Sequence, residues 1–161
     1  MARYKIETST KKDLLDARGK EVEKDILDLG ISKVKSVRYS QVYCLEGEID
    51  KDKIGKIVHR LLIDPVTQDS IINQIDGIEG KGNTSKDGDF VIEVYYKKGV
   101  TDAVGDSVKK GIEDLSIDGI QSAQTGHKYV ISGALKKDDV SKIAERLLAN
   151  KVVQDFYLKG S

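Results

Sequence analysis

RLLIDPVTQD, the segment Arg60–Asp69, decides the fold because it returns 86 residues later as RLLANKVVQD at Arg146–Asp155. Outward from it, Tyr4–Ile71 aligns without a gap on Phe90–Tyr157, and 26 of these 68 positions are identical. Unrelated sequences would share roughly one residue in twenty, so the chain contains a duplication. A period this long is too large for a solenoid repeat and indicates two small domains.

The duplication predicts three regions along the chain. Residues 1–72 and 89–161 are the two repeats, and residues 73–88 between them are rich in glycine and small polar residues, as linkers are. A unit of about 70 residues is near the size at which one hydrophobic core is only marginally sufficient. We therefore expect the two repeats to pack against each other as a pseudo-dimer within one chain.

Each repeat begins with an alternating segment and continues with an amphipathic one. Residues 3–10 and 89–97 alternate in polarity, which predicts a strand. Asp16 and Asp102 follow at N-cap positions, and the apolar residues after them have helical spacing. Gly30 is placed to end the first of these helices. Its counterpart is Ser116, so we expect that the second repeat has a different helix exit.

The second half of each repeat predicts a long strand, a helix and a final strand. Period-two patterns cover about residues 33–49 and 119–135, long enough to bend or break near Ser40 or Gly126. Final strands follow at about residues 66–72 and 152–158. Between them lie apolar residues at helical spacing, namely Ile54, Ile57, Val58, Leu61 and Leu62, then Val140, Ile143, Ala144, Leu147 and Leu148.

These elements predict an α+β fold of two tandem β-α-β-α-β units with a long middle strand. Helices on one sheet face leave the other face and two edges uncovered, which pairing of the repeats would relieve. We expect Pro65 to stop the second helix of the first repeat.

The charge and cysteine content exclude several classes of protein. Lysine plus arginine and aspartate plus glutamate each total 27, and this balance argues against a nucleic-acid or anionic-membrane surface. One cysteine excludes an internal disulfide framework and fits a reducing compartment. No apolar run has the length of a membrane span, and no signal peptide is evident. We expect a cytoplasmic protein.

Catalytic and metal-binding patterns are weak in this sequence. Cys44 lies in mid-strand where the second repeat has Val130, so the position accepts a plain hydrophobe. His59 and His127 lie in different contexts and have no metal-ligand spacing. We expect no catalytic residue, no metal site and no cofactor. Tyr43 and Tyr129 occupy one position in both repeats and fit either sheet packing or a partner contact.

Several motifs resemble those of the PurS family. Leu15–Glu23 (LDARGKEVE) is similar to the start of that family's first helix. Leu61–Asp69 (LLIDPVTQD) and Leu147–Asp155 (LLANKVVQD) resemble its closing Leu-Leu-Ala-Asn-Pro-Val-x-Glu-Asp signature. The Val-Arg-x-Gly-Lys motif of the middle strand is partly present at residues 37–41 and 125–128. The resemblance covers both repeats.

The resemblance implies a role in purine biosynthesis. PurS is the small subunit of phosphoribosylformylglycinamidine synthase and contributes no catalytic residue. Its dimer bridges a glutaminase (PurQ-like) and a synthetase (PurL-like) subunit and is thought to support ammonia transfer between them. Single-chain forms of the enzyme carry a PurS-dimer-like N-terminal domain. The chain is then either an N-terminal region of a fused PurS-PurL synthetase or a free tandem protein, with further self-association open.

Departures from the family motifs suggest two repeats with different neighbours. The first repeat lacks the Gly-Lys pair at Ser40-Gln41, and the second replaces the helix-ending proline with Lys151. We therefore expect the partner or interface contacts at these residues: Arg38, Gln41, Tyr43, Gly126, His127, Lys128 and Tyr129.

Two other functions stay open at this point. Paired βα units of this size often bind amino acids or other metabolites at their interface, as regulatory modules. A small enzyme is the third reading, and its activity would depend on His59, His127 or Cys44.

Overall fold

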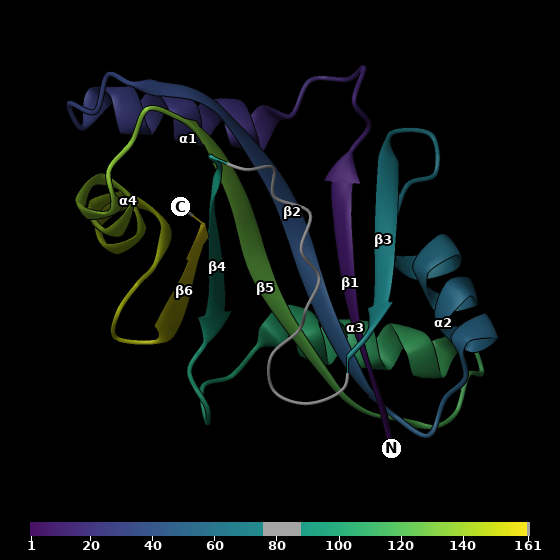
Figure 1. Cartoon of the computed structure of the whole chain (residues 1–161). Coiled ribbons are helices and arrows are strands. Elements are labelled where there is room, and N and C mark those ends of the chain that lie inside the picture. Colours follow the sequence, from purple (N-terminus) through teal and green to yellow (C-terminus); the bar gives the residue numbers. More distant parts are fainter. Residues whose placement is uncertain (76–87, 161) are drawn as a thin grey trace. The chain divides into compact units, whose positions relative to one another are not determined.

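The computed structural model describes residues 1–75 and 88–160, so residues 76–87 of the predicted linker lie outside the described residues. The first repeat contains β1 (Ala2–Thr10), α1 (Ala17–Asp28), β2 (Val34–Gly47), α2 (Lys51–Ile57), η1 (Val58–Leu62) and β3 (Gln68–Gln74). The second contains β4 (Phe90–Tyr96), α3 (Ala103–Asp114), β5 (Ile120–Gly133), α4 (Lys137–Ile143), η2 (Ala144–Leu148) and β6 (Gln154–Gly160). The predicted α+β class and the β-α-β-α-β order of both halves are confirmed (Figure 1).

The strands of the described residues form one antiparallel sheet in the order β3-β1-β2-β5-β4-β6. Ile6 of β1 lies opposite Tyr43 on one side and Ile72 on the other. Ile92 of β4 lies opposite Tyr129 and Leu158, the residues at the same offset. The two halves therefore share one register, and their long middle strands are neighbours in the sheet.

The chain divides into two compact units that interleave the two repeats. Unit 1 holds Met1–Leu14, residues 41–75 and Thr101–Thr125. Unit 2 holds Leu15–Ser40 and residues 88–100 and 126–160. Strands β2 and β5 remain unbroken, and each contributes one half to each unit.

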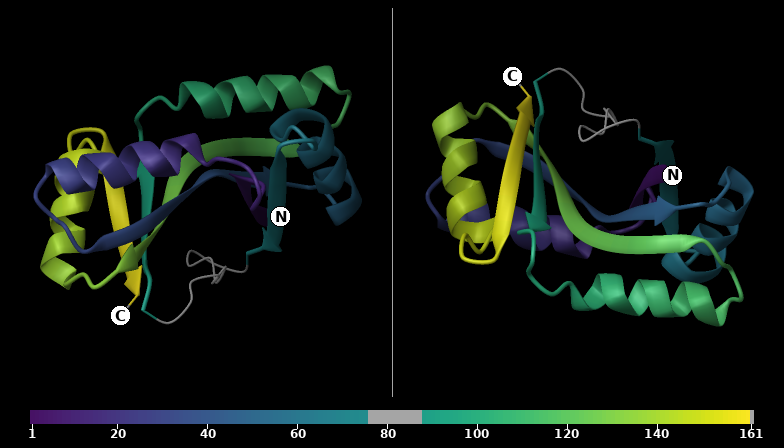
Figure 2. Two further views of the ribbon diagram at one scale, coloured as in Figure 1. Left: turned by 90° about the horizontal axis from the view of Figure 1, so that it is seen from above. Right: turned by 90° about the horizontal axis from the view of Figure 1, so that it is seen from below.

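Each unit takes its longer helix from the opposite repeat. Helix α3 belongs to unit 1 and contacts η1, whereas α1 belongs to unit 2 and contacts η2. Both views of Figure 2 show α3 beside α2 and α1 beside α4. We call α1 and α3 the exchanged helices.

Each unit has its own hydrophobic core, which joins its helices to one face of its strands. In unit 1, Val108 and Ile112 of α3 pack with residues of the first repeat, namely Tyr4, Ile6, Leu45, Ile49, Ile54, Ile57, Val58 and Leu62. In unit 2, Val22 and Ile26 of α1 pack chiefly with residues of the second repeat, including Phe90, Ile92, Val94, Tyr129, Ile131, Val140, Ile143 and Leu148. The exchanged helices therefore bury the same two positions.

A glycine in each exchanged helix allows it to approach the long strand closely. A Cβ atom on Gly19 would lie 2.4 Å from the carbonyl oxygen of Val37, and one on Gly105 would lie 2.5 Å from that of Ala123. A carbon atom cannot lie so close to a carbonyl oxygen, so each helix can pack this closely on its strand only with glycine at this position.

The two exchanged helices end in the same way, so the prediction that the second repeat has a different helix exit is wrong. Gly30 has φ 97° and Ser116 has φ 60°, both in the left-handed region. The N–H of Ile31 donates to Ile26 O at 3.3 Å, and Ile117 repeats this bond at 3.3 Å. Register and packing therefore hold a serine in a conformation that favours glycine.

The second helix ends the same way in both repeats, although only the first has Pro65. The α-helix gives way to the π-helical turns η1 and η2, closed by bonds from Ile63 N–H to Val58 O at 3.1 Å and from Ala149 N–H to Ala144 O at 2.9 Å. Proline is therefore not what ends this helix. Leu61 of the predicted apolar stripe is 38% exposed, whereas its counterpart Leu147 is partly buried.

Candidate functional site

The predicted contact residues lie on β2 and β5, near the points where the exchanged helices are anchored. In unit 2, Asp16 Oδ1 accepts a hydrogen bond from Gly19 N–H at 2.9 Å, and Oδ2 accepts one from Tyr39 N–H at 2.8 Å. One carboxylate thus caps α1 and fixes it to the middle of β2, as the predicted N-cap role of Asp16 requires.

An aromatic cluster of Arg18, Tyr39, His127 and Tyr129 surrounds this anchor in unit 2. The Tyr39 hydroxyl and His127 Nδ1 are hydrogen-bonded at 2.5 Å, and the rings of Tyr39 and Tyr129 have centroids 5.2 Å apart. Arg18 donates to the Tyr129 hydroxyl at 3.4 Å, with its guanidinium carbon 5.9 Å from the ring centroid. These contacts hold a positive charge against a packed aromatic group.

Arg18 provides a permanent charge at the rim of this cluster. Burial acts to lower the pKa of its guanidinium, but the interactions with Tyr129 and Glu21 outweigh this effect and raise the pKa above its usual value. Its side chain is 41% exposed and pairs with Glu21 at 3.2 Å. Arg18 is therefore suited to bind an anionic or aromatic group, and not to transfer protons.

The equivalent positions in unit 1 carry Val104, Thr125, Gln41 and Tyr43. Here Asp102 accepts from Gly105 N–H at 2.8 Å and from Thr125 N–H at 2.6 Å. The Thr125 hydroxyl adds a bond to Asp102 Oδ1 at 2.9 Å. The anchor is the same as in unit 2, but the cation, the histidine and one of the two tyrosines are replaced, and Tyr43 alone keeps an aromatic ring at these positions.

Among these four residues of unit 1, Tyr43 has a shifted pKa. Its partial burial disfavours the phenolate and raises the pKa of Tyr43. The hydroxyl therefore stays neutral through the physiological pH range, as a packing residue with a polar end.

The predicted contact residues differ in their accessibility. Arg38 is exposed, Gln41, Tyr43 and His127 are half-buried, and Gly126, Lys128 and Tyr129 are buried. Tyr129 is only 2% exposed, so it acts in any contact through the residues that it positions. Arg18 and Tyr39 are not among the predicted contact residues, although Arg18 lies within Leu15–Glu23 and Tyr39 within the motif at residues 37–41.

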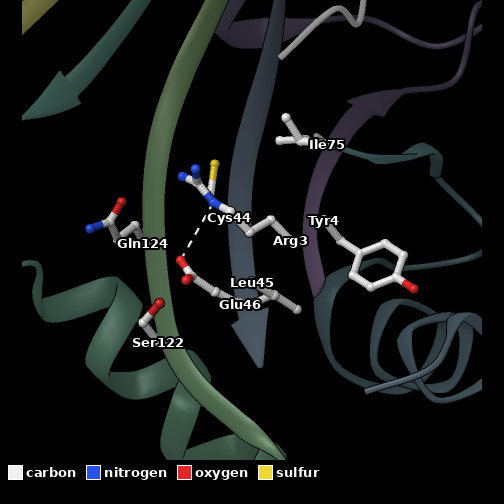
Figure 3. A pocket seen from close by; sticks show the side chains of 8 residues that line it. All are labelled: Arg3, Tyr4, Cys44, Leu45, Glu46, Ile75, Ser122 and Gln124. Carbon is white, nitrogen blue, oxygen red and sulfur yellow. Dashed lines mark ion pairs between the residues drawn. The ribbon is translucent and has the colours of Figure 1, made fainter. Parts of the chain in front are cut away.

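A hollow beside Cys44 in unit 1 is too small for a metabolite. Arg3, Glu46 and Gln124 are among the residues that line it, and Figure 3 shows Arg3 and Glu46 reaching toward one another, with an Nε to Oε2 distance of 3.4 Å. Its volume of about 10 Å³ is room for about one water molecule. His59 lies on η1 and is exposed.

Neither a metal cluster nor a membrane helix is found in the described parts of the chain. Within residues 1–75 and 88–160, no group of three or more His, Cys, Asp or Glu side chains is placed to hold a metal ion. No helix among the same residues is long and apolar enough to cross a membrane.

Comparison with known families decides what this duplicated frame is. The model of the PurS family, described as phosphoribosylformylglycinamidine (FGAM) synthase, matches the chain twice, at residues 3–75 and 89–160. The chain belongs to the PurS family. The resemblance of the quoted motifs is thereby confirmed, in both copies. A search of curated proteins gave no significant match.

PurS membership makes this chain a component of FGAM synthase in purine biosynthesis, and it implies association within that complex. The tandem arrangement gives one polypeptide two PurS-type sets of elements. In this PurS protein the sets exchange their longer helices, so each compact unit depends on both copies.

Proposed function

We propose that this PurS-family chain is a non-catalytic bridge of FGAM synthase. It holds a PurQ-like glutaminase and a PurL-like synthetase together and supports ammonia transfer between them. The proposal rests on one observation. The two units share the same anchor for their exchanged helices, but different residues surround that anchor in each unit. Unit 2 has Arg18, Tyr39, His127 and Tyr129 where unit 1 has Val104, Thr125, Gln41 and Tyr43.

A bridge between two unlike proteins needs two unlike surfaces on a common frame. The frame is the Asp-Gly anchor, which has the same geometry in both units. The surfaces differ in charge, because Arg18 stands where the other unit has Val104. Two unlike surfaces are needed whether the synthetase is a separate chain or is fused to this one. As part of the proposal we place the chain in the cytoplasm, which the single thiol and the purine pathway support.

Reconstitution tests the bridge directly. Purified glutaminase and synthetase are assayed for FGAM formation with and without this chain, once with glutamine and once with ammonium chloride as the nitrogen source. A bridge that supports ammonia transfer raises the glutamine-dependent rate and leaves the ammonium-dependent rate unchanged. Equal glutamine-dependent rates with and without the chain would refute the proposal.

The assignment of one unit to each partner has its own test. Gln41→Ala in unit 1 and His127→Ala in unit 2 are expected to weaken binding to different subunits, because these residues occupy the same position of the two copies. Binding of each variant to each subunit is measured by calorimetry, after thermal denaturation has shown that the variant is folded. Equal losses toward both subunits would count against a division of labour.

A further inference from the structure

Strand β6 is an edge of the sheet, and no described strand pairs with its outer side. It pairs with β4 from Gln154 to Gly160 in an unbroken antiparallel register, and the strand order ends at β6 (Figure 1). Two of its apolar side chains are accessible, Tyr157 at 55% and Leu158 at 38% exposure. An edge of this kind is a template for pairing with a strand of another chain.

The hydrogen bond that begins this ladder shows which residues of β6 face outward. Lys97 N–H donates to Val153 O at 2.8 Å, so these two residues face each other across the ladder. Because facing alternates along a strand, every second residue after Val153 directs its backbone groups toward β4. The N–H and C=O groups of Phe156 and Leu158 therefore point away from β4.

Two residues of opposite charge lie near the ends of the strand. Asp155 Oδ1 is 3.8 Å from Lys97 Nζ, and Lys159 Nζ is 3.9 Å from Glu93 Oε2. The side chains of Asp155 and Lys159 are 53% and 47% exposed, so each has room for a further ionic partner. Charges on an edge strand commonly repel a second strand, but opposite charges at its two ends attract an antiparallel copy.

These features make β6 complementary to itself. When a second copy pairs antiparallel with Tyr157 opposite Tyr157, Asp155 lies opposite Lys159 at both ends of the contact. Phe156 then lies opposite Leu158, and their outward N–H and C=O groups make the hydrogen bonds between the chains. The two Tyr157 residues form a non-hydrogen-bonded pair, in which side chains are closest and aromatic pairs are favourable.

The neighbouring registers lose the ion pairs. Centring the contact on Phe156 puts Asp155 opposite Tyr157, and centring it on Leu158 puts Tyr157 opposite Lys159. Neither arrangement places residues of opposite charge face to face. The charges therefore select the register that is centred on Tyr157.

The equivalent edge strand β3 does not have this complementarity. At the same positions of the first repeat it carries Asp69, Ile71 and Asn73. A copy centred on Ile71 would place each aspartate opposite an asparagine, without an ion pair. Self-pairing is therefore a property of β6 and not of the duplicated fold.

We propose that β6 is a docking edge for a second copy of this chain, which pairs antiparallel about Tyr157 and continues the sheet. The contact uses the same strand in both chains, so it closes at two chains. It spans Asp155–Lys159, far fewer residues a side than the roughly 20–30 of a standard interface. We therefore expect a weak dimer with a dissociation constant on the order of 100 µM. This inference does not depend on the proposed bridging function.

The test reverses the charge at each end of the strand in the full chain. Asp155→Lys and Lys159→Glu each turn both facing ion pairs into like-charge pairs, and each should weaken self-association about tenfold or more in sedimentation equilibrium. An equimolar mixture of the two variants should recover the association, because every facing pair then has opposite charges. Asp69→Lys is the matched control on β3 and should associate like the unmodified chain. Thermal denaturation first establishes that each variant is folded.

Several results would overturn the inference. One is an unmodified chain that stays monomeric up to about 1 mM, which would leave the edge to a strand of a different protein. Others are charge variants that associate within twofold of the unmodified chain, or a mixture that does not recover. Equal weakening by Asp69→Lys would place the contact elsewhere and overturn it as well. None of these results bears on the bridge, which the reconstitution tests separately.

Discussion

The anchor in unit 1 and the anchor in unit 2 each fix an exchanged helix to a long strand, but different residues surround them. Asp16 and Asp102 make the same two backbone bonds, to the N–H groups of Gly19 and Tyr39 and of Gly105 and Thr125. Beyond those bonds the units diverge. Tyr39 reaches His127, whereas the shorter Thr125 turns its hydroxyl back onto Asp102.

This comparison shows where the duplication retained identity and where it allowed change. Asp16 and Gly19 have identical counterparts in Asp102 and Gly105, because the bonds need the carboxylate and the close approach needs a residue without a Cβ atom. The residues that project from the long strands differ, because no backbone bond depends on their identity. The frame and the surface of each unit can therefore be disturbed separately by mutation.

The largest expected effect on stability comes from mutations that push an exchanged helix away from its long strand. Gly19→Ala and Gly105→Ala each place a methyl group within 2.5 Å of a strand carbonyl oxygen, at Val37 and Ala123. Each change is expected to destabilise the chain by about 3 kcal/mol in urea unfolding, because the backbone itself must move.

Gly55→Ala provides the control for this pair. Gly55 lies in α2, and a Cβ atom there would meet nothing within 4 Å. The change is expected to stabilise the chain by about 0.5 kcal/mol through helix propensity. If Gly19→Ala behaves like Gly55→Ala, the close approach of α1 and β2 is wrong.

Removal of the anchoring carboxylate ranks second. Asp16→Ala is expected to cost about 2 kcal/mol, from the lost helix cap and the unpaired N–H of Tyr39. Asp102→Ala should cost about 1 kcal/mol more, because Thr125 also loses a bond from its hydroxyl.

A double-mutant cycle with Thr125→Val identifies the source of that difference. In the Thr125→Val background, the cost of Asp102→Ala should fall to that of Asp16→Ala. Equal costs for the two aspartates in the unmodified chain would show that the hydroxyl bond contributes nothing measurable.

The order of elements and the core positions could be predicted from the sequence, because they follow from local periodicity. The stripes that hold Val22 and Ile26, and Val108 and Ile112, are buried as their spacing indicates. The exchange of α1 and α3 between the units could not be predicted, because identical stripes fit either copy. Only the tertiary contacts choose between them.

The helix ends show the same limit. The sequence contrasts Gly30 with Ser116 and Pro65 with Lys151, yet each pair has one backbone conformation. Bonds several residues apart fix these ends, and they override the local preference of a single residue. At the candidate site, the motifs predict His127 and Tyr129, whereas the role of Arg18 depends on the packing of α1 beside β5, which no motif contains.

Mutation of the residues at the two helix exits measures how far these bonds override the local preference. Ser116→Gly is expected to stabilise the chain by about 1 kcal/mol, because serine at φ 60° is strained and glycine is not. Gly30→Ser should destabilise it by a similar amount. Thermal unfolding of both variants is the measurement, and an unchanged midpoint for Ser116→Gly would show that Ser116 is not strained.

The smallest effect concerns Tyr43, and it is visible only in alkali. Burial raises the pKa of Tyr43 above its ordinary value of 10.0, so the folded chain holds this proton more tightly than the unfolded chain does. The resulting stability is fully present below about pH 10 and is lost as the pH rises through the folded pKa. Tyr43→Phe should therefore flatten the decline in unfolding free energy above about pH 10.

Tyr157→Phe is the matched control, since that phenol is 55% exposed. Urea unfolding of both variants between about pH 8 and 11 compares the two slopes. The control should keep the decline of the unmodified chain, whereas Tyr43→Phe should not. If the unfolding free energies of both variants decline alike, the Tyr43 hydroxyl is not buried against the core of unit 1. The units would then differ less in how they pack Tyr43 and Tyr129 than the structure indicates.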